Sequence, residues 1–254
     1  MQKIEFSLLG RNNYKLTDFI TIHIPTIGEI KKTEISELEY CQSVYFFTRT
    51  QCDLIVELYE NGVDYRKINN YELFASFFNT EIQNQSIPNE IWSLMFENLD
   101  RSEIVTSIRK EDNKIVFCNK NGDLIIDEDI YEKIANIFRQ INLKEKNTEY
   151  LKVPTDAGYK YIVDRMKLKH ERMKRDKKNI SSELDGYILL LVNNHNFKYN
   201  FQTVNDITIY DFYCSFKQIY KDKEVDGLLS AYSYGNVKAE DLTVNAWHHQ
   251  AVEK

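Results

Sequence analysis

The sequence contains few of the residues that make tight turns, with only 8 glycines and 3 prolines among 254 residues. This scarcity disfavours a sandwich of many short strands and favours helices joined by polar loops. It also leaves little material for a glycine-rich loop around phosphate, and no Walker-type or dinucleotide-binding glycine pattern occurs. GxSxG and HExxH are absent as well. We therefore expect a protein that is not an enzyme and has no catalytic residues; an enzyme built from scattered residues is the alternative.

Cysteine is also scarce. The four cysteines form no CxxC pair and have no histidine near them in the sequence; they are Cys41, Cys52, Cys118 and Cys214. Small buried apolar side chains are a better interpretation than a metal site or a disulfide framework. His248-His249 has no third or fourth ligand in view, and residues 119–123 lack the closing glutamate of a calcium loop. We expect no metal and no cofactor, and no stoichiometric zinc in the purified protein.

Long apolar segments are missing too. No run approaches the roughly 20 residues that a membrane-spanning helix needs. Residues 1–15 contain no apolar segment that ends in a small-residue cleavage site. We expect a cytosolic protein.

Aromatic residues are abundant, with 17 tyrosines and 14 phenylalanines. Residues 206–220 (DITIYDFYCSFKQIY) are apolar almost all round at helical spacing, and such a helix is usually buried among other elements. Asn205 or Asp206 could cap its first turn. This segment predicts the centre of a helical core, with Phe212, Tyr213 and Phe216 largely buried.

The remaining segments predict a mostly α protein with a small β component (α+β), at roughly 55% helix. We expect two parts, an N-terminal α+β part (1–148) and a C-terminal helical part (149–254) around the aromatic helix, although one shared core is also possible. Short strands are expected at 3–9 and 19–24, and hairpins at about 103–126, where Asn121-Gly122 marks a turn. The expected helices are 27–31, 37–48, 50–59, 70–78, 90–99, 128–141, 155–176, 182–194 and 224–234.

Charge is distributed unevenly. Residues 165–178 contain eight Lys and Arg and two acids, a balance of about +6, which leaves about −12 for the rest of the chain. A solvated helix face is one interpretation; an acidic protein partner and nucleic acid are the others. No aromatic residue interrupts this run, which weakens the case for stacking on single strands. The candidate partner-binding residues are Arg165, Lys167, Lys169, Arg172, Lys174 and Arg175.

Three segments carry a family resemblance. Residues 24–30 (IPTIGEI) are similar to an extended "PTI-x-EI" opening, and residues 61–65 (NGVDY) lead into residues 70–74 (NYELF). The third segment is 206–212 (DITIYDF), continuing through Tyr232, Gly235 and Lys238 to Trp247. In this order they resemble structural-module proteins of tailed phages of Gram-positive bacteria, described as tail assembly chaperone-like. The hairpins in the middle and the first helix, rich in Cys and Tyr, depart from that pattern.

The resemblance implies a non-enzymatic phage morphogenesis factor that binds other virion or tail proteins, above all the long helical tape measure protein. It implies a place in the host cytoplasm, or in the virion if the protein is structural. The alternatives are a structural component of the neck, tail or baseplate, and a nucleic-acid-binding protein that uses the basic helix.

Overall fold

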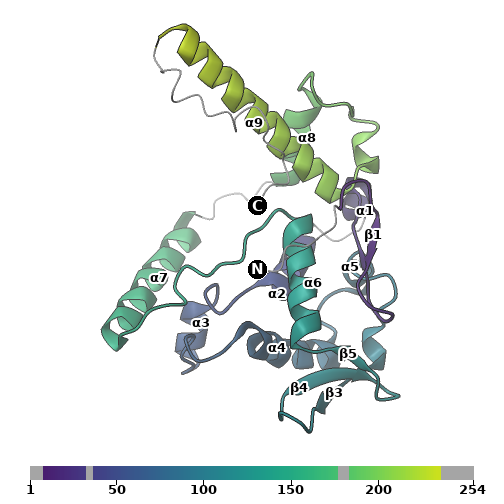
Figure 1. Ribbon diagram of the computed structural model, residues 1–254, viewed down its shortest axis with the longest axis vertical. Coiled ribbons are helices and arrows are strands. Elements are labelled where there is room, and N and C mark those ends of the chain that lie inside the picture. The colour runs from purple at the N-terminus through teal and green to yellow at the C-terminus, as the bar shows by residue number, and fades with distance from the viewer. Residues whose placement is uncertain (1–7, 33–36, 177–182, 236–254) are drawn as a thin grey trace.

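The computed structural model describes residues 8–32, 37–176 and 183–235, without the side chains of 173–176 (Figure 1). The chain is 54% helical and 10% strand, with two small antiparallel sheets in its N-terminal half. This confirms a mostly α protein with a small β component. No helix among the described residues is long and apolar enough to span a bilayer.

A two-stranded sheet begins the described chain. Strand β1 (Asn13–Lys15) pairs antiparallel with β2 (Thr21–His23). Strand β2 confirms the strand expected at 19–24. Strand β1 lies between the two expected strands, because Leu16 and Thr17 both donate backbone hydrogen bonds to Ile20 and close the hairpin there. Most of the other expected strand, 3–9, lies outside the described residues.

Helix α1 (Ile27–Lys32) joins the N-terminal sheet to the C-terminal half. Thr26 and Glu29 form a reciprocal cap: the Glu29 N–H donates to Thr26 Oγ1 at 3.1 Å, and the Thr26 N–H donates to Glu29 Oε2 at 2.7 Å. The Ile27 N–H donates to the carbonyl of Ile207, 2.9 Å away. A Cβ at Gly28 would lie 2.8 Å from the backbone oxygen of Asn205, so glycine permits this close approach.

The other helices and the three-stranded sheet follow the expected order. The helices are α2 (Glu37–Thr48), α3 (Ile55–Glu60), α4 (Asn70–Asn84), α5 (Asn89–Ser93), α6 (Glu128–Ile141), α7 (Asp156–Asp176), α8 (Glu183–Val192) and α9 (Ile209–Ser233), with 3-10 turns η1 (Arg101–Glu103) and η2 (Val204–Asp206). The strands are β3 (Ile104–Ile108), β4 (Ile115–Asn119) and β5 (Leu124–Ile126), in the order β3-β4-β5. They confirm the hairpins expected at about 103–126.

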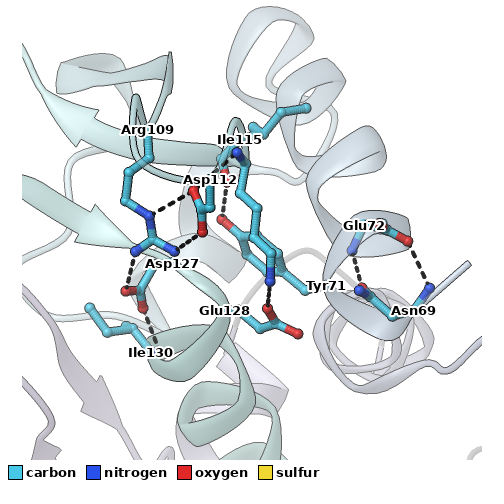
Figure 2. A network of polar contacts seen from close by, with 10 residues as sticks. Asn69, Tyr71, Glu72, Arg109, Asp112, Ile115, Asp127, Glu128 and Ile130 are labelled. Carbon is cyan, nitrogen blue, oxygen red and sulfur yellow. Dashed lines mark hydrogen bonds and ion pairs between the residues drawn. The ribbon is translucent and has the colours of Figure 1, made fainter.

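A polar network holds the β3-β4 hairpin against α4 and α6 (Figure 2). The Arg109 guanidinium donates to both carboxylate oxygens of Asp112, at 3.1 and 2.7 Å, and lies 3.5 Å from Asp127. Asp127 also accepts from the Ile130 N–H at 3.0 Å and so caps α6. The Tyr71 hydroxyl donates to the carbonyl of Ile115 at 2.6 Å. Turn, strand and two helices are thus fixed together.

The main core is aromatic at its centre. Phe47 of α2 is fully buried and contacts rings from three other helices and the segment after α5; these are Phe74, Phe78, Trp92, Phe96 and Phe138. The same cluster includes Leu184, Ile188 and Phe212 from the C-terminal half. Side chains from both sides of residue 148 therefore share this core, and the division into parts 1–148 and 149–254 stays a prediction.

A buried ion pair closes the end of α4. The carboxylate of Glu81 and the guanidinium of Arg101 are 2.7 Å apart, and their side chains are 1% and 5% exposed. Glu81 also accepts from the backbone N–H groups of Ser86 and Ile87, each at 3.1 Å. Arg101 donates to the carbonyl of Ile87 and to Asn89, and its guanidinium lies over the Trp92 ring. This cluster connects α4, α5 and η1.

The aromatic helix differs from the expectation in three respects. The expected helices 206–220 and 224–234 form one continuous helix, α9, in which the Gln218 side-chain amide donates to Asp222 at 2.9 Å across the expected gap. Its cap is Thr208, whose Oγ1 accepts from the Asp211 N–H at 3.1 Å, and not Asn205 or Asp206. Phe212 is fully buried, whereas Tyr213 and Phe216 are half-buried.

Two further helices are shorter than expected. The helix expected from Thr50 begins at Ile55, because the Thr50 N–H and hydroxyl both donate to Asp53 and form a turn first. The helix expected over 90–99 ends at Ser93, since Phe96 forms an antiparallel bridge with Ile22 of β2. Tertiary pairing overrides local helical spacing at that point.

Candidate partner-binding surface on the basic helix

Helix α7 carries the basic run, and an ionic network holds its beginning. Thr155 caps the helix by accepting from the Gly158 N–H at 3.1 Å. Arg66 donates to Asp64 at 2.8 Å and to Asp156 at 2.9 Å, and its guanidinium lies 4.5 Å from the centre of the Tyr159 ring. Its hydrogen bonds lower the pKa of Asp64. The first turn of α7 is therefore attached to the loop before α4.

A small satellite core anchors the inner face of α7. Ile162 and Val163 are buried against α3 and α4 residues; the other buried members are Leu54, Ile55, Leu58, Tyr65 and Leu73. Tyr159 stacks on Tyr65 with ring centres 5.5 Å apart. This core is distinct from the main core, and Figure 1 shows α7 beside α3, away from α8 and α9.

Two polar side chains of α7 point to the α3 side. The ammonium of Lys167 lies 4.5 Å from the centre of the Tyr59 ring, a cation–π contact. His170 Nδ1 is 4.0 Å from Glu57 Oε1. Lys167 thus belongs to the contact between α7 and α3 and is separated from the other candidate residues.

The outward face of α7 combines cations with apolar side chains. Arg165, Lys169 and Arg172 are exposed, while Tyr161 is 65% exposed and Leu168 is 56% exposed. Positions 161, 165, 168 and 172 are spaced by four, three and four residues, so they share one side of the helix. We call Tyr161, Arg165, Leu168, Lys169 and Arg172 the α7 outer face.

The structure thus brings together three of the six candidate residues. Lys174 and Arg175 lie in the last turn of α7, but their side chains are outside the described part. The sequence pattern did not single out Tyr161, which precedes the basic run, or Leu168, which lies among its cations. Their seven-residue separation is visible in the sequence, but it becomes informative only once the buried face of the helix is known.

Arg165 and Arg172 differ from most other arginines of the chain. Among the described residues, neither has a carboxylate within salt-bridge distance. Most of the other arginines contact a carboxylate, a backbone carbonyl or an aromatic ring; these are Arg49, Arg66, Arg101, Arg109 and Arg139. The forked guanidinium donors of Arg165 and Arg172 remain available for a partner.

A small pocket apart from α7 is a weaker candidate for a binding site than the α7 outer face. Its volume is about 250 Å³, and it is lined by Tyr45, Thr48, Asp53, Arg139, Lys144 and Glu145. Arg139 already donates to the Thr48 carbonyl at 2.7 Å, and Asp53 accepts from Thr50 and Asn147. The side chains of Asp53 and Arg139 are therefore already hydrogen-bonded within the fold.

The described part of the chain contains no group of three or more His, Cys, Asp or Glu able to hold a metal ion. Burial raises the pKa of all four cysteine thiols and keeps them in the protonated, weakly nucleophilic form; these are Cys41, Cys52, Cys118 and Cys214. His248 and His249 lie outside the described residues.

Comparison with known proteins finds a similarity in the C-terminal part. Residues 174–251 match the family model described as the YomV second domain, a phage-type family named for a Bacillus prophage protein. The match supports a phage origin. It begins in the last turn of α7 and includes α8 and α9, while the α7 outer face precedes it. No curated protein and no solved structure matches the chain.

Proposed function

We propose that this chain is a non-enzymatic phage morphogenesis protein that acts by binding other virion proteins. The phage-type match over residues 174–251 supports the phage setting. The observation that carries the binding role is the α7 outer face, where unpaired guanidinium groups stand beside exposed apolar side chains. Exposed apolar residues rimmed by polar groups are typical of protein contact sites.

Within this class we propose a tail assembly chaperone whose partner is the tape measure protein. Such a factor holds a long helical protein during tail assembly and leaves before the particle is complete. A structural component of the neck, tail or baseplate is the second candidate. The outer part of α9 favours it, because this part projects from the body and exposes Leu228 and Tyr232 (Figure 1). A projecting apolar helix suits a permanent contact.

Analysis of particles and assembly intermediates distinguishes the two. Disrupting the gene should abolish infectious particles and leave heads without complete tails. Mass spectrometry should detect an assembly factor in complex with tail proteins before particles mature and should not detect it in purified particles. A structural component would remain in mature particles at a fixed copy number. Normal yields of normal particles after disruption would contradict both roles.

A charge-reversed variant connects the function to α7. Arg165→Glu, Lys169→Glu and Arg172→Glu should leave the fold intact, since exposed charges contribute little to stability individually. The gene with these three changes should fail to restore infectious particles in the disrupted phage. Lys167 is excluded from the set because of its contact with Tyr59. Full restoration by the variant would show that the α7 outer face is not the assembly contact.

A further inference from the structure

We propose that the α7 outer face binds an amphipathic helix whose apolar stripe is flanked by carboxylates. This inference rests on the proposed binding function and specifies the chemistry of the partner at that site. It follows from how apolar and charged groups alternate on α7, from their exposure, and from the charge of the surrounding molecule.

Tyr161 and Leu168 form an apolar seam along the α7 outer face, with the spacing of a helix–helix contact. Tyr161 and Leu168 are separated by seven residues, or two turns, which place them about 10.5 Å apart along the axis. A second helix with apolar residues at the same heptad spacing can pack against both. Their exposures of 65% and 56% leave large apolar areas for such a partner to cover.

The cations repeat at the same interval. Arg165 and Arg172 are also seven residues apart and alternate with the apolar pair, with Lys169 on the same edge of the seam; the exposed acids Asp164 and Glu171 lie on its other edge. Each planar guanidinium can accept a carboxylate in a bidentate arrangement. Glutamates on the arginine side of the partner's apolar stripe would therefore pair with Arg165 and Arg172.

The same features favour a helix over nucleic acid. Leu168 lies between the two arginines, so a phosphate backbone bound to both would leave this apolar side chain in water. The rest of the chain carries about −12 and repels a polyanion within the Debye length of about 8 Å. An acidic helix carries far fewer negative charges than a polyanion, so it is repelled less. Its binding also buries Tyr161 and Leu168.

Synthetic peptides test this chemistry directly. The probe is a fluorescently labelled helical peptide with leucine at i, i+4, i+7 and i+11 and glutamate on both sides of that stripe. The matched peptide carries lysine in place of every glutamate. Fluorescence polarisation with the full chain should show binding of the acidic peptide, weakening as salt rises, and no binding of the basic peptide.

Two variants separate the charge from the seam. The double variant Arg165→Glu, Arg172→Glu should bind the acidic peptide at least about tenfold more weakly at low salt. It should also bind the lysine peptide, which the wild type does not. Leu168→Ser should lower the affinity for the acidic peptide about tenfold at every salt concentration, because the contact that is lost is apolar. Charge-matched and size-matched controls are Arg11→Glu with Lys110→Glu, and Leu38→Ser, all exposed sites away from α7. Circular dichroism verifies that each variant is folded.

Several results would overturn the inference. One is a wild-type chain that leaves the acidic peptide unbound at millimolar concentration; another is a control variant that loses as much binding as the α7 variants. Displacement of the peptide by a short oligonucleotide with a steeper salt dependence would assign the surface to nucleic acid. Self-association in sedimentation that disappears in the α7 variants would assign it to a second copy.

The peptide assay and the phage assay can fail independently. Peptide recognition that disappears in the Arg165→Glu, Arg172→Glu variant would support the helix-binding surface. If a phage with that variant still assembled normally, the role in assembly would be wrong while the recognition chemistry stood. If the variant phage failed to assemble but the wild-type chain did not bind the acidic peptide, the assembly role would stand and the acidic helix would be rejected as its partner.

Discussion

Replacing Glu81 by alanine should strongly destabilise the protein, because the Arg101 guanidinium would remain buried without its counter-charge. The two groups are 2.7 Å apart and almost inaccessible to water. Breaking a buried pair by removing one partner costs about 3–5 kcal/mol. The Ile87 N–H would also lose its acceptor. In a domain of this size, each kcal/mol of lost stability lowers the melting temperature by about 2–4 °C, so the variant should melt about 6–20 °C below the wild type.

Urea unfolding measured by fluorescence provides the assay, and Trp92 provides the signal, since the Arg101 guanidinium lies 5.2 Å from its ring. Glu90→Ala is the control: this exposed glutamate of α5 should change the free energy of unfolding by no more than about 0.5 kcal/mol. In a double-mutant cycle, Glu81→Leu should be less harmful in an Arg101→Met background than in the wild type, by at least about 1 kcal/mol. A Glu81→Ala variant within about 1 kcal/mol of wild type would refute the buried ion pair.

Three further measurements address other parts of the fold. Phe212→Ala should lower the free energy of unfolding by about 3–5 kcal/mol, and Phe216→Ala by clearly less because Phe216 is half-buried; equal midpoints in urea would contradict this order. Asp127→Ala should cost about 1 kcal/mol through loss of the α6 cap, and Asn at this position should restore most of it. Alkali should destabilise the chain: burial raises the pKa of Tyr45 to about 12, above the unfolded value near 10, so its contribution is complete below pH 10 and is lost as the pH rises toward 12. Urea midpoints that stay constant from pH 9 to 11.5 would refute that effect.

Local sequence signals predicted the elements that local interactions determine. The bounds of α2 agree with the expected 37–48, and those of α6 with 128–141; in α6, apolar spacing and the Asp127 cap both act within one helix. The start of α3 could not be found this way, since Thr50 serves a side-chain turn with Asp53 and not a helix. A cap-type residue alone does not distinguish the two.

Long-range contacts limited the prediction of the surface. The basic run lies on α7, but only the packing of α7 against α3 shows which cations face outward. Lys167 turns toward Tyr59, and Leu168 turns to solvent, although they are adjacent in sequence. The pairing of Glu81 with Arg101 across 20 residues likewise follows from the fold and leaves no periodic signal.

The satellite core has a consequence for the order in which the molecule opens. Among the described residues it contains seven buried side chains, against forty in the main core. Regions with few buried contacts open at a lower free energy than the whole protein. Helices α3 and α7 should therefore separate together as one cooperative unit while the aromatic core remains closed. In native-state hydrogen exchange their amides would then share one opening free energy, well below that of α6, and binding of a helix to α7 would raise it.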